Sequence, residues 1–285
     1  MLGKLIKHEA IADFRLLGPA YGVIVVLALL TRLATWIATR QALANVVSSS
    51  FANVLQGLAS LLLIVFIAAA FAGVVLTIFY MIYRFYKNFF TDEGYLMMTL
   101  PAKPAALIFS KFINAIVWIV VSVAVSALGI WFVFSQFEEL KASIEQFIDL
   151  FKTILAMNGS VVTDSLGVNM PTFVTEMCFY IVFWFSRFAF TCYFAIAFGQ
   201  LISKNHKIGG AVLAYIVETI AISILSTVYM GLENTIFPKF ISDYATSTGV
   251  ATQCTLIGGL VLNVLISALL YWLVSLIMTR RLNLD

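Results

Sequence analysis

The chain has 285 residues, of which 62% are hydrophobic and only 11% are charged, whereas a soluble domain is about 45–50% apolar and about 25% charged. This composition excludes a soluble globular protein and predicts an all-α integral membrane protein, because only lipid can cover that much apolar surface. The formal net charge of +3 gives no argument for nucleic-acid binding.

Residues 1–17 are predicted to form an interfacial amphipathic helix. Its cationic arc comprises Lys4, Lys7, His8 and Arg15. Leucine and isoleucine side chains lie broadly opposite, although Glu9 and Asp13 interrupt that side. Such a helix lies in the headgroup plane with its cations towards anionic lipid; the alternative is that these residues form the cytosolic first turns of the first span. Gly18-Pro19 is expected to break the helix, so that the chain turns into the membrane.

Six apolar segments follow, and each is long enough to cross about 30 Å of hydrocarbon, which needs about 20 residues. The predicted spans are residues 20–39, 58–83, 105–134, 173–202, 209–230 and 255–278. Residues 1–285 are therefore interpreted as one transmembrane domain, with spans one to three in 20–134, spans four to six in 173–278 and a cytosolic tail at 279–285.

The distribution of cationic residues predicts the orientation. Most of the 17 lysines and arginines fall in segments that share one side with the two termini, and positive charge favours the cytosolic side. We therefore expect a multi-pass protein with both termini in the cytosol.

The outer segment at 136–170 carries a predicted helix of its own. Apolar residues recur there at helical spacing, namely Leu140, Ile144, Phe147, Phe151 and Leu155. Such an amphipathic helix could lie on the bilayer surface, contact a partner, or dock on the spans of its own chain, which is the interpretation we prefer.

Catalytic and metal-binding motifs are missing from the sequence. It has no phosphate-binding G-x-x-x-x-G-K-[ST] loop, no G-x-S-x-G and no H-E-x-x-H. His8 and His206 are isolated, and no two of the three cysteines form a C-x-x-C pair. We expect neither a catalytic residue nor a metal site in this chain, which is therefore not expected to be an enzyme.

The loop between spans two and three, residues 84–104, is the most informative stretch. Thr91 or Asp92 can cap a short helix, which Pro101 would stop. This helix would expose apolar side chains beside two acids, namely Tyr95, Leu96 and Met98 beside Asp92 and Glu93. The pattern is typical of a surface that docks into another protein, and the alternative is an ordinary interfacial turn.

The sequence Phe-Thr-Asp-Glu-Gly-Tyr-Leu-Met-Met-Thr-Leu-Pro at 90–101 closely resembles the loop of bacterial ATP-binding-cassette (ABC) transporter permeases of the type-two exporter family. The N-terminal amphipathic segment, the six spans and the inside termini are similar to that family. So are 198–204 followed by Gly209-Gly210, and the closing residues 280–285.

The resemblance implies a permease subunit in the bacterial plasma membrane that exports a peptide or an amphiphilic, lipid-like substrate. A second permease chain, identical or different, would complete the pathway. Separate ATPase subunits would bind ATP and Mg, so that this chain binds no cofactor. The loop would be a cytosolic coupling helix, whose contact residues are Thr91, Asp92, Glu93, Gly94, Tyr95, Leu96 and Met98. A smaller contact would involve Lys204 and His206. The family usually places its outer helices between spans five and six, whereas the larger outer segment here lies between spans three and four.

Ionisable groups within the spans are costly and usually face a bundle interior or water. Arg187 in span four and Glu218 in span five are predicted to pair near the middle of the membrane. The pair would hold the two spans together or line a pathway for a polar or cationic substrate. Other possible pathway residues are Glu176, Asn114 and Gln200.

Two further functions are compatible with these features. A stand-alone secondary transporter would use ionisable groups within the membrane for ion coupling. A non-transporting membrane scaffold or sensor subunit would bind partners, including membrane lipid, without moving a substrate.

Overall fold

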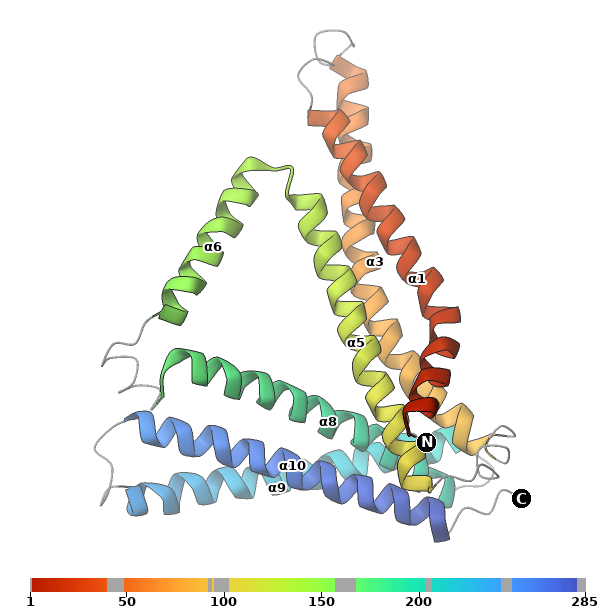
Figure 1. The fold of residues 1–285 in the computed structure, drawn as a ribbon, viewed down its shortest axis with the longest axis vertical. Helices are drawn as coiled ribbons and strands as arrows, with labels where there is room; N and C mark the ends of the chain where they lie inside the picture. Colours follow the sequence, from red (N-terminus) through yellow and green to blue (C-terminus); the bar gives the residue numbers. More distant parts are fainter. Residues whose placement is uncertain are drawn as a thin grey trace. The chain divides into compact units, whose positions relative to one another are not determined.

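The computed structural model describes residues 2–39, 49–91, 94, 103–156, 168–202, 207–241 and 248–280. Within these ranges the regular elements are all helices, shown in Figure 1. They are α1 (Leu2–Thr39), α3 (Ser49–Phe90), α5 (Pro104–Phe134), α6 (Glu138–Ala156), α8 (Met170–Ile202), α9 (Lys207–Ile241) and α10 (Thr248–Arg280).

Six of these helices are long and apolar enough to cross a membrane. Their candidate spans are Gly3–Ala38, Asn53–Phe90, Pro104–Phe134, Met170–Ile202, Ile208–Leu232 and Thr252–Thr279. The prediction of six spans is thus confirmed, and the chain has the architecture of a multi-pass membrane protein. Many large apolar side chains are exposed on these helices, as expected where lipid is the solvent.

The predicted break at Gly18-Pro19 is wrong, because α1 continues through Pro19 from Leu2 to Thr39. A proline removes one backbone hydrogen bond and can kink a helix without ending it. Residues 2–17 are consequently the first turns of one long helix rather than a separate interfacial helix. The reason lies in packing, since a single buried stripe crosses the proline: Asp13, Leu17, Tyr21, Ile24 and Ala28.

Helix α3 is also longer than predicted, because Arg84–Phe90 is helical rather than part of a loop. Phe85 and Phe89, one helical turn apart, are 1% and 0% exposed. Burial of these rings stabilises the extra turns of α3. The helix ends at Phe90, and Thr91 is the first residue after it.

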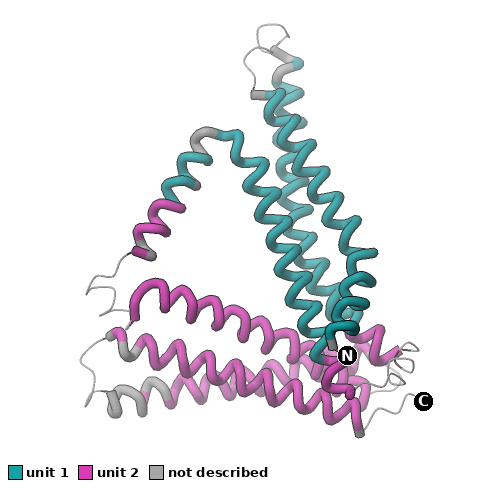
Figure 2. Tube along the Cα trace, in the orientation of Figure 1, with its two compact units in different colours: residues 1–84, 109–147 teal, residues 85–108, 148–285 magenta. Residues whose placement is uncertain are grey.

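The chain divides into two compact units, coloured separately in Figure 2. Unit 1 comprises residues 1–84 and 109–147, which include α1 and most of α3 and α5. Its core joins these three helices through Leu17, Tyr21, Ile24, Ala28, Phe66, Met81, Ala115, Trp118 and Val133. The Tyr21 hydroxyl and the Thr77 hydroxyl lie 2.9 Å apart at its centre, so the core also contains a satisfied polar contact.

Unit 2 comprises residues 85–108 and 148–285, and in it α8 packs against both α9 and α10. A side chain at Gly199 would place its Cβ 2.3 Å from the backbone nitrogen of Ala211, so α8 and α9 are in backbone contact beside their connection. Spans four and five are thus neighbours, as the predicted pairing of Arg187 with Glu218 requires. Gly258 of α10 likewise faces Tyr229 of α9, so these two helices also approach closely at a small residue.

The predicted outer helix is present as α6. Its apolar side chains Phe147 and Leu150 are 67% and 57% exposed. Docking of α6 on the spans of its own chain therefore stays a prediction.

Candidate functional site

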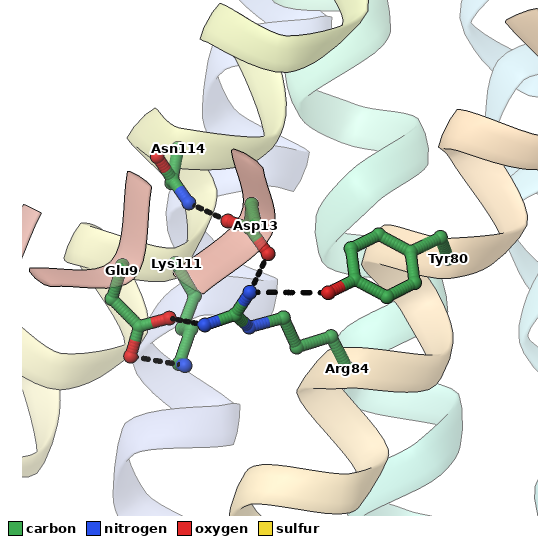
Figure 3. Close-up of polar contacts among 6 residues, drawn as sticks. All are labelled: Glu9, Asp13, Tyr80, Arg84, Lys111 and Asn114. Carbon is green, nitrogen blue, oxygen red and sulfur yellow. Dashed lines mark hydrogen bonds and ion pairs between the residues drawn. The ribbon is translucent and has the colours of Figure 1, made fainter. Parts of the chain in front are cut away.

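A cluster of charged side chains is buried where α1, α3 and α5 meet in unit 1 (Figure 3). Glu9 and Asp13 project from α1 one turn apart, and Arg84 projects from α3. Lys111 and Asn114 lie three residues apart on α5. Spacings of three and four residues place side chains on one face of a helix, so each of α1 and α5 contributes two groups to the same point.

Arg84 is the centre of the cluster. Its Nη2 lies 2.9 Å from Oε2 of Glu9, and its Nη1 forms an ion pair with Oδ1 of Asp13. The same Nη1 donates a hydrogen bond to the hydroxyl of Tyr80, one turn earlier on α3, at 3.2 Å. One guanidinium thus binds both acids of α1 from a side chain on α3, which uses the forked geometry of arginine.

The third helix joins through Lys111 and Asn114. Lys111 forms an ion pair with Oε1 of Glu9, and the Asn114 amide donates a hydrogen bond to Oδ2 of Asp13. Each acid of α1 is therefore held by one group from α3 and one from α5. Figure 3 shows these contacts as dashed lines that run from Glu9 and Asp13 to Arg84 and to the two side chains of α5.

Burial makes these contacts interdependent. The side chain of Asp13 is 0% exposed, that of Lys111 5%, that of Glu9 11% and that of Arg84 13%. Taking one such charge out of water costs several kcal/mol, which only close partners offset. Two acids and two bases balance, so the cluster is neutral as a whole and loses that neutrality if any one of these four charges is removed.

Sequence reasoning missed this cluster. It treated Glu9 and Asp13 as interruptions of an amphipathic pattern and assigned Asn114 to a possible pathway. A usable signal was present, because two acids at a spacing of four on an otherwise apolar helix face require cationic partners. Arg84 and Lys111, both adjoining or inside apolar spans, are residues of the matching charge.

The predicted coupling residues lie mostly outside the described part of the chain. Asp92, Glu93, Tyr95, Leu96, Met98, Lys204 and His206 are in this group. Of the two that are described, Thr91 donates its hydroxyl to the carbonyl of Lys87 at the end of α3. The amide of Gly94 donates to the carbonyl of Thr91 at 2.7 Å. A Cβ at Gly94 would lie 2.5 Å from the carbonyl oxygen of Phe89, so this tight turn requires glycine.

Arg187 and Glu218 lie on the packed helices α8 and α9, but no ion pair joins them within the described residues. Arg187 lines a cavity of about 430 Å³ between the two helices. Glu218 is 7% exposed and lies beside Thr191. Neither of its carboxylate oxygens has a hydrogen-bond partner of good geometry among the described residues. Arg187 therefore has no acidic partner within the described residues, whereas Glu218 is a buried carboxyl group that contacts Thr191.

The three possible pathway residues are divided between the two units. Asn114 belongs to the cluster in unit 1, whereas Glu176 and Gln200 lie on α8 in unit 2. The last two are separated by about 36 Å along the helix axis at 1.5 Å per residue. Each has a buried polar atom without a hydrogen-bond partner in the described structure, Oε2 of Glu176 and Nε2 of Gln200.

Comparisons with protein-family models, with curated proteins and with solved structures find no match for this chain. The fold itself defines a multi-pass helical membrane protein. Its two distinguishing features are a neutral, buried charge cluster in unit 1 and a cavity with an arginine in unit 2.

Proposed function

We propose that this chain is the membrane-spanning permease subunit of an ABC transporter, which exports a peptide or an amphiphilic, lipid-like substrate. The observation that carries the proposal is the sequence at 90–101, which begins at the last residue of α3 and resembles the coupling loop of type-two exporter permeases. Six membrane-length helices support it. The chain has no catalytic role in the proposal, and separate ATPase subunits bind ATP and Mg.

The buried cluster suggests how such a loop acts on the spans. Arg84 lies seven residues before Thr91 on the same chain, about 10 Å along a helix axis. A displacement of α3 along its axis shifts Arg84 relative to its two partners on α1. Because that guanidinium holds both Glu9 and Asp13, α1 either moves with α3 or loses ion pairs. Closure of the ATPase pair would in this way favour one of two arrangements.

The proposal includes a second permease chain, the same or different, and a plasma membrane of a bacterium with both termini in the cytosol. The excess of lysine and arginine on the side of the termini supports this orientation.

The test is co-expression with a candidate soluble ATPase, followed by purification in detergent. Replacing Tyr95 and Leu96 with alanine is expected to remove ATPase association and substrate-stimulated ATP hydrolysis. Tyr83→Ala is the matched control, because Tyr83 is 58% exposed on α3 outside the loop. Unchanged association in the Tyr95 and Leu96 double variant would contradict the proposal.

A stand-alone secondary transporter is the second candidate, favoured by Glu218, a buried ionisable group within a span that forms no ion pair among the described residues. It predicts substrate flux into liposomes driven by an ion gradient without any ATPase, and loss of that flux in Glu218→Gln. If neither ATP nor an ion gradient drives flux while a partner still binds, the scaffold or sensor alternative holds instead.

A further inference from the structure

The cavity between α8 and α9 has the chemistry of an anion site inside the membrane. Its volume of about 430 Å³ falls within the range of about 300–1,000 Å³ that is usual for small-molecule sites. It combines one cation with hydroxyl groups and aromatic rings. The residues used below are Arg187, Thr219, Thr227, Trp184 and Tyr215, all of which line it.

Arg187 lacks an ion pair and a hydrogen bond within the described residues. It lies near the middle of α8, about 25 Å from Met170 and about 22 Å from Ile202 along the axis. An unpaired arginine at the centre of a span is costly and marks a functional site by default. Arg32 of α1, by contrast, donates to the Ser135 hydroxyl at 2.8 Å and stacks on Phe132.

The hydroxyls do not replace the missing partner. Thr219 and Thr227 donate to the carbonyls of Tyr215 and Ser223 on their own helix, at 2.7 and 2.9 Å. These two hydroxyls are therefore engaged as donors, none of the hydrogen bonds of the described residues joins them to Arg187, and Arg187 is the charged donor among the residues that line the cavity. Glu218, buried beside Thr191, is not among the residues that line the cavity.

We propose that this cavity binds the phosphate headgroup of an anionic amphiphile. The planar fork of an arginine matches two phosphate oxygens. Trp184 and Tyr215 supply aromatic surface for the attached apolar part. The exposed apolar residues of α9 that follow, including Ile216 and Ile220, continue that surface into lipid.

The depth of the site separates this ligand from ordinary surrounding lipid. Headgroups of bulk lipid lie at the interface, about 15 Å from the middle of a hydrocarbon core about 30 Å thick. A headgroup bound to Arg187 lies near the middle of the membrane instead, where a transported molecule must pass. The inference thus deepens the proposed function by naming a substrate class, and the binding is measurable without any ATPase.

The experiment is a titration of the purified full-length chain in dodecyl maltoside with dodecyl phosphate, at constant total detergent, followed by tryptophan fluorescence. A saturable change is expected in the unaltered protein and not in Trp184→Phe, which assigns the signal to the cavity. Arg187→Gln is expected to raise Kd at least tenfold. Lys152→Gln, which removes a cation that is 70% exposed on α6, is expected to leave Kd unchanged.

Comparisons in the unaltered protein keep the test decisive if Arg187→Gln does not fold. Uncharged dodecyl glucoside giving the same Kd as dodecyl phosphate would overturn the headgroup assignment. Inorganic phosphate giving that Kd would overturn the amphiphile and leave a site for a free anion. An unchanged Kd in a folded Arg187→Gln would overturn the role of Arg187. None of these results depends on ATPase association, so they are distinct from a failure of the proposed transporter.

Discussion

Replacing Asp13 with asparagine tests whether the buried cluster holds α1, α3 and α5 together. Asparagine keeps the shape of the side chain and removes its charge, which leaves Arg84 with Glu9 as its one acidic partner in the cluster. Removing one partner of a buried pair costs about 3–5 kcal/mol. Exposures of 13% and 0% for the two side chains mean that water screens this pair little. Arg84→Met leaves the opposite excess charge and is expected to cost about the same.

The double variant Asp13→Asn with Arg84→Met separates charge balance from the loss of contacts. It restores neutrality, because Glu9 and Lys111 remain as a pair. Its loss of stability is therefore expected to be smaller than the sum of the two single losses, by up to about 3 kcal/mol.

The assay is thermal unfolding of the purified full-length chain in detergent, where Asp13→Asn is expected to lower Tm by roughly 6–20 °C, taking about 2–4 °C per kcal/mol for a chain of this size. Replacing Lys141 and Glu145 with Met and Gln is the control. That pair is 4.0 Å apart with side chains 55% and 64% exposed, so no change is expected. Simple addition of the two single losses, or an unchanged Tm in Asp13→Asn, would refute the reasoning.

Two further substitutions test the packing of unit 2, also by thermal unfolding in detergent. Gly199→Ala brings a Cβ to 2.3 Å from the backbone nitrogen of Ala211 and is expected to cost about 1–3 kcal/mol of stability by overpacking. Gly231→Ala is the control, because a Cβ there meets nothing within 4 Å, and it should be neutral or stabilising. Equal effects of the two substitutions would contradict the close approach of α8 and α9. Phe85→Ala removes a ring that is 1% exposed and is expected to cost about 3–5 kcal/mol of stability. Phe79→Ala is the control, because its ring is 65% exposed, and it should change the stability little. A large loss of stability in both variants would mean that burial of the ring is not the cause.

The number and rough limits of the spans follow from the sequence because hydropathy measures the property that lipid selects. Each backbone group must be satisfied within the helix, so a long apolar run has one available structure. The neighbouring position of spans four and five also followed from the sequence, because only a short connection separates residues 173–202 from residues 209–230. Pro19 shows the limit of such signals. This proline was predicted to end the helix, but α1 continues through it because buried residues before and after Pro19 lie on one face.

The buried cluster could not be located from the sequence in the same way. Glu9, Arg84 and Lys111 are far apart along the chain, and their meeting depends on how three helices are rotated about their axes. Hydropathy and periodicity describe one helix at a time and leave that rotation open. The same limit explains why Arg187 and Glu218, correctly placed on neighbouring helices, do not meet as a pair in the described structure.

The buried cluster also has a consequence for biosynthesis. The ribosome produces Glu9 and Asp13 first, Arg84 only after α1 and most of α3, and Lys111 and Asn114 later still. Until then the two carboxylates of the nascent first helix lack the partners from α3 and α5 that bind them in the folded unit. The three helices of unit 1 can pack together only once α5 has left the ribosome. Glu9 and Asp13, although synthesised before their partners, are therefore among the last residues of the unit to reach their final contacts.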